Sequence, residues 1–406
     1  MSEQQLPLAG VRVVEFTHMV MGPTCGLILG DLGAEVIKVE PVAGDSTRRL
    51  KGSGAGFFPT FNRNKKSIAL DLHHAEGLEI ALRLVGRADI VSENFKPSTM
   101  RKLGLDYESL SRLNERLIYV SHKGFLPGPY EHRTALDEVV QMMGGLAYMT
   151  GPEGRPLRAG SSVNDIMGGM FGAIGAMAAL RQREQTGRGQ QVQSALFENN
   201  IFLVAQHMMQ FAVTGKPAAP MPSRISAWGI YDVFTVKDDA QIFLAVVSDT
   251  QWAIFCDAFG FEDLKNQPCH ASNNLRVEAR GTLIPILRER LTALPVETVT
   301  EKFESWGLPF APIARPHELF DDPHLNASGG LAPVRVGEAT EPATARVPLL
   351  PITLDGQRPG LRLQPPRLGE HTDELLASLG YGNAQISDLK ARAVAASLSF
   401  PKLEET

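Results

Sequence analysis

Three short segments, rich in amide and cationic side chains, are the first sign of chemistry in this chain. They are 62–72 (NRNKKSIALDL), 93–97 (ENFKP) and 121–125 (SHKGF). Each lies at the start or the end of a candidate β-strand, and open α/β sheets bind ligands at the carboxyl ends of their strands. Any one of them alone is typical of an ordinary loop. Together they suit a long anionic ligand that carries phosphates.

A nicotinamide dinucleotide is one such ligand. Glu40 closes the second candidate strand, where dinucleotide-binding folds carry an acid for the ribose. The turn before it, however, reads HMVMGP at 18–23 in place of G-x-G-x-x-G, and Pro23 removes an amide that could hold a phosphate. The sequence therefore disfavours this cofactor.

Asp165 precedes an apolar run at 166–180, IMGGMFGAIGAMAAL. The run is shorter than the roughly 20 residues of a membrane span, so we expect a buried helix whose glycines allow another backbone to approach closely. Asp is a favoured N-cap, worth about 1 kcal/mol. A helix N-terminus would also favour an ionised carboxylate and offer amides to developing charge. A capping role and a chemical role are both open.

The elements that must position these residues alternate between strand and helix. The expected strands are 11–16, 35–39, 67–72, 89–92 and 117–121, and the helices between them are 24–31, 75–87, 98–103 and 107–114. This pattern predicts an α/β fold with a large, Rossmann-like, doubly wound domain. Further helices are expected at 135–149, 163–184 and 195–214, with a short strand at 191–193.

A proline-rich stretch, GKPAAPMP at 215–222, marks a change of domain. We expect the N-terminal part of the large domain at 1–214, a linker at 215–228, a smaller α+β domain at 229–328, and a return segment with C-terminal helices at 329–406. The small domain is predicted to contain a hairpin at 230–235 and 241–247, helices at 250–259, 276–293 and 296–306, and a strand at 311–315. The tail helices are expected at 372–380 and 386–396.

The composition is that of an ordinary globular protein, with 406 residues of which 43% are hydrophobic and 21% charged. The net charge of -5 argues against general affinity for nucleic acid or anionic lipid. The three cysteines show no disulfide framework and no metal spacing. The N-terminus lacks a charged-then-apolar signal. We therefore expect a cytoplasmic protein without a metal site that binds neither membranes nor nucleic acid.

The chain resembles the class III CoA-transferase family, which includes formyl-CoA and carnitine CoA-transferases. The resemblance rests on the order and spacing of FTHMVMGP, LGAEVIKVE, NRNKKSIALDL, DIVSENFKP, SHKGF and TGRGQQV. It runs from Leu8 to about Phe197 and resumes weakly after Trp228. The resemblance implies a CoA-binding large domain, an interlocked homodimer, and coenzyme A as a substrate with no permanently bound cofactor.

Asp165 matches the position of the family's nucleophile. The implied chemistry is attack of this carboxylate on an acyl-CoA thioester, which gives a mixed anhydride and then an aspartyl-CoA thioester. The acceptor acid reverses the sequence. Asp137 matches an acid near the nucleophile, and it would position or tune Asp165 or serve a surface or capping role.

The resemblance also implies contacts with both substrates. The implied CoA contacts are His18, Met19, Leu70, Asp71, Leu72, Asn94, Phe95, Lys96, Arg101, Lys102 and Arg133. Pro41 and Thr134 depart from basic residues of some members, and Arg133 is a possible substitute for the second. Val20 replaces a polar amide of formyl-CoA transferases, which argues against formate or oxalate. The implied substrate residues are Val20, Arg48, Trp228 and Gly229.

We expect an enzyme that transfers CoA from an acyl-CoA to a small carboxylic acid. Arginines such as Arg48, Arg49 and Arg224 favour a dicarboxylate such as succinate, malate, citramalate, itaconate or mesaconate. The nearest alternative is an α-methylacyl-CoA racemase, whose base is a histidine where this chain has Leu136. A CoA lyase or hydrolase and a non-catalytic acyl-CoA-binding protein are further alternatives, and the last has no need of Asp165.

Overall fold

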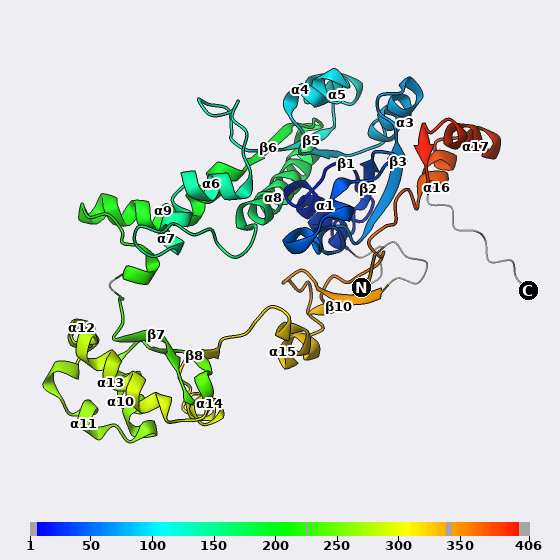
Figure 1. Cartoon of the computed structure of the whole chain (residues 1–406). Helices are drawn as coiled ribbons and strands as arrows, with labels where there is room; N and C mark the ends of the chain where they lie inside the picture. Colours follow the sequence, from blue (N-terminus) through cyan, green and yellow to red (C-terminus); the bar gives the residue numbers. More distant parts are fainter. Residues whose placement is uncertain (1–5, 225, 338–342, 398–406) are drawn as a thin grey trace, which may run out of the picture. The chain divides into compact units, whose positions relative to one another are not determined.

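The computed structural model describes residues 6–224, 226–337 and 343–397. It divides the chain into two compact units (Figure 1). The large unit comprises Met1–Ala218 and Pro323–Thr406, and the small unit comprises Ala219–Asp322. The first boundary falls inside the predicted linker 215–228. The chain then leaves the small unit and returns to the large one, to which the C-terminal helices belong.

A seven-stranded sheet forms the centre of the large unit, in the order β12-β3-β2-β1-β4-β5-β6. Its strands are β1 (Arg12–Phe16), β2 (Glu35–Glu40), β3 (Lys65–Leu70), β4 (Ile90–Glu93), β5 (Ile118–Lys123), β6 (Gln191–Ala195) and β12 (Ala395–Ala396). All neighbouring pairs are parallel except β12 with β3. The order 3-2-1-4-5-6 is that of doubly wound sheets, so the predicted α/β class is confirmed.

Helices cover both faces of this sheet because successive strand residues point to opposite sides. Val13 belongs to a buried cluster with Ile90, against α1 and α8, whereas Val14 belongs to a cluster with Val91 on the other face. The helices of this unit are α1 (Met21–Asp31), α2 (Phe57–Phe61), α3 (Ala75–Val85), α4 (Pro97–Lys102), α5 (Tyr107–Leu113), α6 (Asp137–Met143), α7 (Leu146–Thr150), α8 (Val163–Thr186), α9 (Leu196–Thr214), α15 (Pro323–Ala327), α16 (Thr372–Ser378) and α17 (Asn383–Ala391).

Helices α1 and α8 pack closely because α8 presents glycines to α1 and to the sheet. A Cβ on Gly169 would lie 2.5 Å from the Cβ of Thr24 and 2.6 Å from the carbonyl oxygen of Met21. A Cβ on Gly172 would lie 2.5 Å from Cε1 of His122. The expected close approach is therefore confirmed. Within the described residues, α8 is also the helix long and apolar enough to cross a membrane by length and composition alone, a test that core helices pass too.

We expect Gly169→Ala to destabilise the large unit by about 1–3 kcal/mol, because the new methyl group would push α1 away from α8. Gly281, in a helix of the small unit, has no heavy atom within 4 Å of an added Cβ. Gly281→Ala is therefore the matched control, with a gain of up to about 1 kcal/mol. Urea unfolding measures the stability of both variants against the unaltered protein. A Gly169→Ala protein as stable as the Gly281→Ala protein would contradict this view of the α1–α8 contact.

Three predicted helices differ in the structure. The helix expected at 135–149 is split into α6 and α7, because Gly145 adopts φ 86 between them. The helix expected at 276–293 is split into two at Ala279. The helix expected at 386–396 ends at Ala391, and Ala395–Ala396 pair with Leu70 and Ala69. This last segment covers the free edge of β3, which would otherwise expose unpaired backbone groups.

The small unit has α+β architecture, as predicted. Its strands β7 (Ile230–Thr235), β8 (Gln241–Val246) and β9 (Phe310–Pro312) form an antiparallel sheet. The predicted hairpin is confirmed, and its turn places Asp238 and Asp239 at φ 60 and 58. Its helices are α10 (Asp249–Phe259), α11 (Glu262–Lys265), α12 (Asn273–Glu278), α13 (Arg280–Thr292) and α14 (Val296–Ser305). A separate two-stranded sheet, β10 (Leu331–Val336) with β11 (Ala343–Pro348), belongs to the large unit.

Candidate active site

The segments that follow β1 and β4 meet at the point where the strand order reverses. The Asn94 side chain accepts the N–H of His18 at 3.0 Å and donates to its carbonyl oxygen at 2.8 Å. The His18 ring stacks on Phe95, with ring centres 4.9 Å apart. Burial lowers the pKa of His18. Three predicted CoA residues are thus brought together at the usual ligand position of such a sheet.

Met19 lies in the turn between β1 and α1 with a left-handed backbone, φ 62. This conformation is strained for a non-glycine residue, and such strain concentrates at functional sites. The turn is held by a hydrogen bond of 3.0 Å from the N–H of Met19 to Oγ1 of Thr47. The Met19 side chain is 37% exposed, whereas Val20 is 1% exposed. The turn therefore exposes Met19 and buries Val20, and their assignments to the CoA and substrate sites stay predictions.

A cleft of about 660 Å³ opens beyond the carboxyl ends of β4, β5 and β6. Five predicted CoA residues line it, namely Asn94, Phe95, Lys96, Arg101 and Arg133. Its lining also contains Lys123, His122, His132, Glu131 and Gln193. The excess of cationic groups over carboxylates suits a ligand with several phosphates.

The other predicted CoA residues lie outside the lining of this cleft. Lys102 is exposed on α4 next to Arg101. Leu70 is fully buried in the core at the end of β3, and Leu72 packs against the same core. The carboxylate of Asp71 accepts the N–H of His73 at 2.9 Å. The side chains of Leu70 and Leu72 therefore serve packing.

Asp165 lies in the first turn of α8 and is partly buried. Among the residues that the structure describes, no group hydrogen-bonds to its carboxylate, whereas its N–H donates to Oδ1 of Asp137 at 3.2 Å. Burial raises the pKa of Asp165 to about 7; the neighbouring charge of Asp137 acts in the same direction and that of Arg158 in the opposite one. Such a carboxylate is more basic than an exposed one and is not occupied by a structural partner.

Asp137 caps the helix that carries Asp165. Its Oδ1 accepts hydrogen bonds from the N–H of Asn164, at 2.8 Å, and from the N–H of Asp165. Its Oδ2 accepts a hydrogen bond from Nε2 of Gln141 at 2.5 Å. The α8 amides that we expected to be offered to developing charge are therefore used by Asp137. Because the Asp137 carboxylate binds the backbone N–H groups of Asn164 and Asp165, Asp137 is placed to fix the orientation of Asp165.

Sequence reasoning missed Arg158, which lies in the loop between α7 and α8. Its Nη2 is 3.9 Å from Oδ2 of Asp137, and its Nη1 is 3.5 Å from Oε2 of Glu138. No motif marks this arginine in the sequence. Its proximity to Asp137 follows from the fold of the loop, which no periodic pattern specifies.

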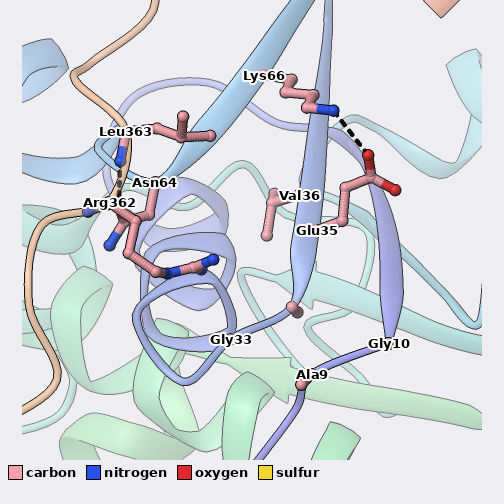
Figure 2. Close-up of a pocket in the computed structure, with 10 residues that line it drawn as sticks. Ala9, Gly10, Gly33, Glu35, Val36, Asn64, Lys66, Arg362 and Leu363 are labelled. Atoms are coloured by element: carbon pink, nitrogen blue, oxygen red, sulfur yellow. Dashed lines mark hydrogen bonds and ion pairs between the residues drawn. The ribbon is translucent and has the colours of Figure 1, made fainter. Parts of the chain in front are cut away.

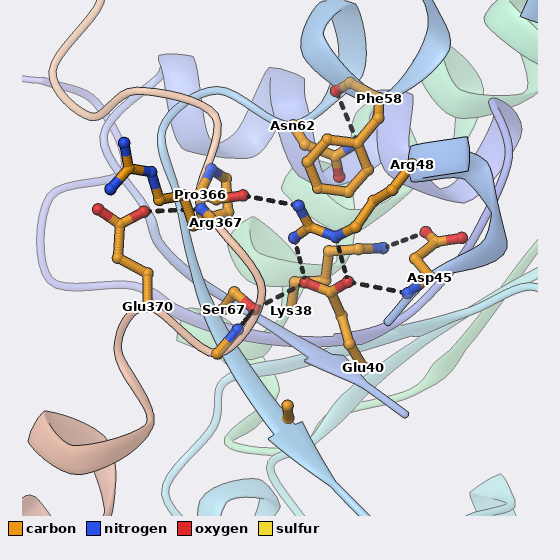
Figure 3. A network of polar contacts seen from close by, with 12 residues as sticks. Lys38, Glu40, Asp45, Arg48, Phe58, Asn62, Ser67, Pro366, Arg367 and Glu370 are labelled. Atoms are coloured by element: carbon orange, nitrogen blue, oxygen red, sulfur yellow. Dashed lines mark hydrogen bonds and ion pairs between the residues drawn. The ribbon is translucent and has the colours of Figure 1, made fainter. Parts of the chain in front are cut away.

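Arg48 lies in a buried polar network around Glu40 (Figure 3). Its Nε and Nη2 donate to the two Glu40 carboxylate oxygens at 2.8 and 2.6 Å, and its Nη1 donates to the carbonyl oxygen of Pro366 at 3.0 Å. Burial acts to raise the pKa of Glu40. The hydrogen bonds and the positive charge of Arg48 outweigh burial and hold this pKa below its ordinary value. Both side chains are thus engaged inside the protein, and the assignment of Arg48 to the substrate site stays a prediction.

A second hollow, of about 360 Å³, lies at the amino ends of β1, β2 and β3 (Figure 2). Lys66 in its wall pairs with Glu35 at 2.9 Å and with Glu374 at 2.7 Å, and Arg362 donates to the carbonyl oxygen of Gly30. These cations are used internally, and ligands of such sheets bind at the opposite edge. The cleft beside Arg133 is therefore the candidate site.

Trp228 and Gly229 belong to the small unit. The Trp228 ring packs on Tyr231, with ring centres 4.7 Å apart, and the Gly229 N–H donates to Oδ1 of Asn273 at 3.2 Å. Their assignment to the substrate site stays a prediction.

Comparison with known proteins gives similarities over nearly the whole chain. The model of CoA-transferase family III matches residues 8–372. The beta subunit of the succinyl-CoA–L-malate CoA-transferase of Chloroflexus aurantiacus is 32% identical, over 96% of this chain and 98% of that protein. The succinate–glutarate CoA-transferase of Agrobacterium fabrum is 33% identical, over 93% and 97%. The crystal structure of a CAIB/BAIF family protein from Brucella suis superposes with a TM-score of 0.82, at 34% identity, over 92% and 99%.

Proposed function

Because the chain belongs to CoA-transferase family III and is thus an enzyme that transfers CoA, we propose that it moves CoA between an acyl-CoA and a small dicarboxylic acid by covalent catalysis on Asp165. The observation that carries the proposal is the Asp165 carboxylate, which accepts no hydrogen bond from any residue that the structure describes and lies in a turn fixed by Asp137. The cationic cleft supports binding of the CoA phosphates.

The reaction proceeds through four acyl transfers. A carboxylate oxygen of Asp165 attacks the thioester carbon, the C–S bond breaks, and CoA leaves as a thiolate from a mixed anhydride. The thiolate attacks the Asp165 carbonyl carbon, which releases the donor acid as a carboxylate and leaves an aspartyl-CoA thioester. The acceptor carboxylate repeats both steps in reverse, so that the new acyl-CoA leaves and the Asp165 carboxylate returns. The net reaction consumes no proton.

Dicarboxylates are the favoured acids. The related proteins named above act on malate and on glutarate, and both acids carry a second carboxylate that a cationic site would recognise. We propose succinyl-CoA as the donor and a C4 or C5 dicarboxylate as the acceptor.

Racemisation is disfavoured by the groups around Asp165. Leu136 stands before Asp137, is 63% exposed, and cannot carry a proton. His122 lines the cleft, but burial lowers its pKa to about 3, which makes it a weak base. A second proton-transfer group opposite Asp165 is therefore not supplied by these positions.

A screen of acids tests the function directly. The protein is incubated with succinyl-CoA and, in turn, malate, glutarate, mesaconate, itaconate and acetate, and the thioesters are identified by mass. We expect new CoA thioesters of dicarboxylates. Release of succinate without a new thioester would indicate a hydrolase, and exchange of the α-proton of a 2-methylacyl-CoA in D2O would indicate a racemase.

The rate is expected to depend on pH through Asp165. The ionised carboxylate is the nucleophile and its pKa is raised to about 7. Below pH 7, kcat/KM should therefore fall by about tenfold per pH unit, and above it the profile should level off. Steady-state rates from pH 5 to 9 measure this profile, and a flat profile down to pH 5 would contradict the assignment.

We also propose a homodimer in which the second copy covers an apolar face of α9. This helix exposes large apolar side chains along its length: Phe202, Leu203, Met208, Met209, Phe211 and Val213. An exposed patch of this kind marks an interaction surface. Sedimentation should give twice the 44.2 kDa of the chain, and Met209→Glu should reduce this mass; a single-chain mass for the unaltered protein would refute it. Interlocking predicts, in addition, that tagged and untagged dimers do not exchange chains.

A further inference from the structure

We propose that Arg158 receives the carboxylate of the acceptor acid as it approaches Asp165, an inference that rests on the proposed function. It would make Arg158 a specificity-determining residue of the transfer. The argument has three parts: the loop that carries Arg158 is fixed, its guanidinium is loosely paired, and an incoming carboxylate needs a cation at this place.

The backbone on either side of Arg158 is tied to α6 and α7. The N–H of Leu157 donates to the carbonyl oxygen of Ala147 at 3.0 Å, and the N–H of Ala159 donates to Oε1 of Gln141 at 2.8 Å. The same Gln141 side chain donates to Oδ2 of Asp137 at 2.5 Å and is fully buried. The Gln141 side-chain amide therefore binds both the Asp137 carboxylate and the loop that carries Arg158, and it fixes their relative position.

Within residues 6–224, 226–337 and 343–397, the guanidinium of Arg158 has no tight ionic partner. Its nearest carboxylate oxygens lie at 3.5 Å on Glu138 and 3.9 Å on Asp137, and its Nε donates to the neighbouring carbonyl oxygen of Ala159 at 3.2 Å. Buried arginines of this chain pair at 2.6 Å, for Arg63, and at 2.5 Å, for Arg276. The Arg158 side chain is also 41% exposed. Its fork of donors is thus open to a carboxylate from solvent.

The surroundings of Asp165 would repel an acid substrate without this cation. Asp137 and Asp165 are joined through a carboxylate-to-amide contact of 3.2 Å, and Glu138 adjoins Asp137 in α6. Arg158 and the Asp165 backbone lie against the two oxygens of the same Asp137 carboxylate. An acceptor carboxylate that attacks the carbonyl carbon of the Asp165–CoA thioester must enter this acidic neighbourhood. Arg158 supplies a cation there, with Nη2 3.9 Å from the carboxylate that holds the Asp165 N–H, and its charge acts on Asp165.

The test compares Arg158→Gln with the unaltered enzyme in two reactions. In transfer from acetyl-CoA to malate or glutarate, we expect KM for the acid to rise about 10- to 100-fold, with KM for acetyl-CoA nearly unchanged. In single-turnover trapping with hydroxylamine, which is uncharged, the aspartyl hydroxamate on the Asp165 peptide should form as in the unaltered enzyme. Arg158→Lys should recover part of the acid affinity.

Arg155→Gln is the matched control, because Arg155 is an exposed arginine of the same loop, and it should leave both reactions unchanged. Unaltered KM for the acids in Arg158→Gln would overturn the proposal. Loss of hydroxamate formation together with transfer would also overturn it, since Arg158 would then support the Asp137–Asp165 turn. If the unaltered enzyme neither transfers CoA nor traps hydroxylamine at Asp165, the proposed function itself fails.

Discussion

Asp165→Asn is expected to lower kcat for CoA transfer by at least about 10⁴-fold, because an amide cannot attack a thioester and return as a leaving group. The substitution is nearly isosteric, and it retains the backbone N–H that donates to Asp137 at 3.2 Å. Steady-state assays with succinyl-CoA and a dicarboxylate measure the loss. Hydroxylamine trapping gives the second readout, since the hydroxamate should vanish from the peptide that contains position 165.

The same variant should be more stable than the unaltered protein at pH 8. The pKa of Asp165 is raised in the folded state from 3.8 to about 7, so folding favours the protonated acid. The carboxyl group therefore costs no stability below pH 4, and the cost grows as the pH rises to about 7 and then stays constant. Replacement by asparagine removes this cost, so the free energy of unfolding should rise by up to about 4 kcal/mol at pH 8 and should not change at pH 4.

Calorimetry at the two pH values separates these expectations from a general effect of substitution. Asp137→Asn is the control, because it keeps the shape of the cap but removes the charge that acts on Asp165. It should lower the pH midpoint of the rate without abolishing transfer. An Asp165→Asn protein that still transfers CoA would refute the assignment of the nucleophile. A stability gain over the unaltered protein that is no larger at pH 8 than at pH 4 would contradict the raised pKa of Asp165.

The central strands were predictable because a parallel sheet is covered on both faces. β1, β2 and β4 read as short, apolar, β-branched runs, and their observed bounds fall within one residue of the predicted ones. β12 was missed because two alanines carry no strand signal, and their place depends on the open edge of β3. The break between α6 and α7 was missed because one left-handed glycine, Gly145, interrupts an otherwise helical pattern.

The candidate site was predictable to the extent that it follows the strand ends. His18 and Asn94 lie far apart in sequence, but both follow strands that are neighbours in the sheet, and the structure joins them by two hydrogen bonds. How firmly each arginine is paired was not predictable. Arg48 and Arg158 look alike in sequence, but the fold gives the first a bidentate carboxylate at 2.6 and 2.8 Å. The carboxylate oxygens paired with the second lie at 3.5 and 3.9 Å.

Lys65→Met is expected to cost about 3–5 kcal/mol of stability, because it leaves a buried carboxylate without its partner. Nζ of Lys65 lies 2.8 Å from Oε1 of Glu15, and both side chains are fully buried. This ammonium also donates to the carbonyl oxygen of Pro23 at 2.9 Å, beneath the first turn of α1. Lys66→Met is the matched control from the same strand. Its ammonium is 22% exposed and pairs near the surface, so its loss should cost less than about 1 kcal/mol.

The pair also predicts how that cost changes with a second substitution. The double variant Lys65→Met with Glu15→Leu removes both charges and should recover most of the stability of the unaltered protein. Urea unfolding of the single and double variants measures both stabilities. If the double variant were no more stable than Lys65→Met, the cost would come from lost packing or from the contact with Pro23, and the buried charge would not explain it.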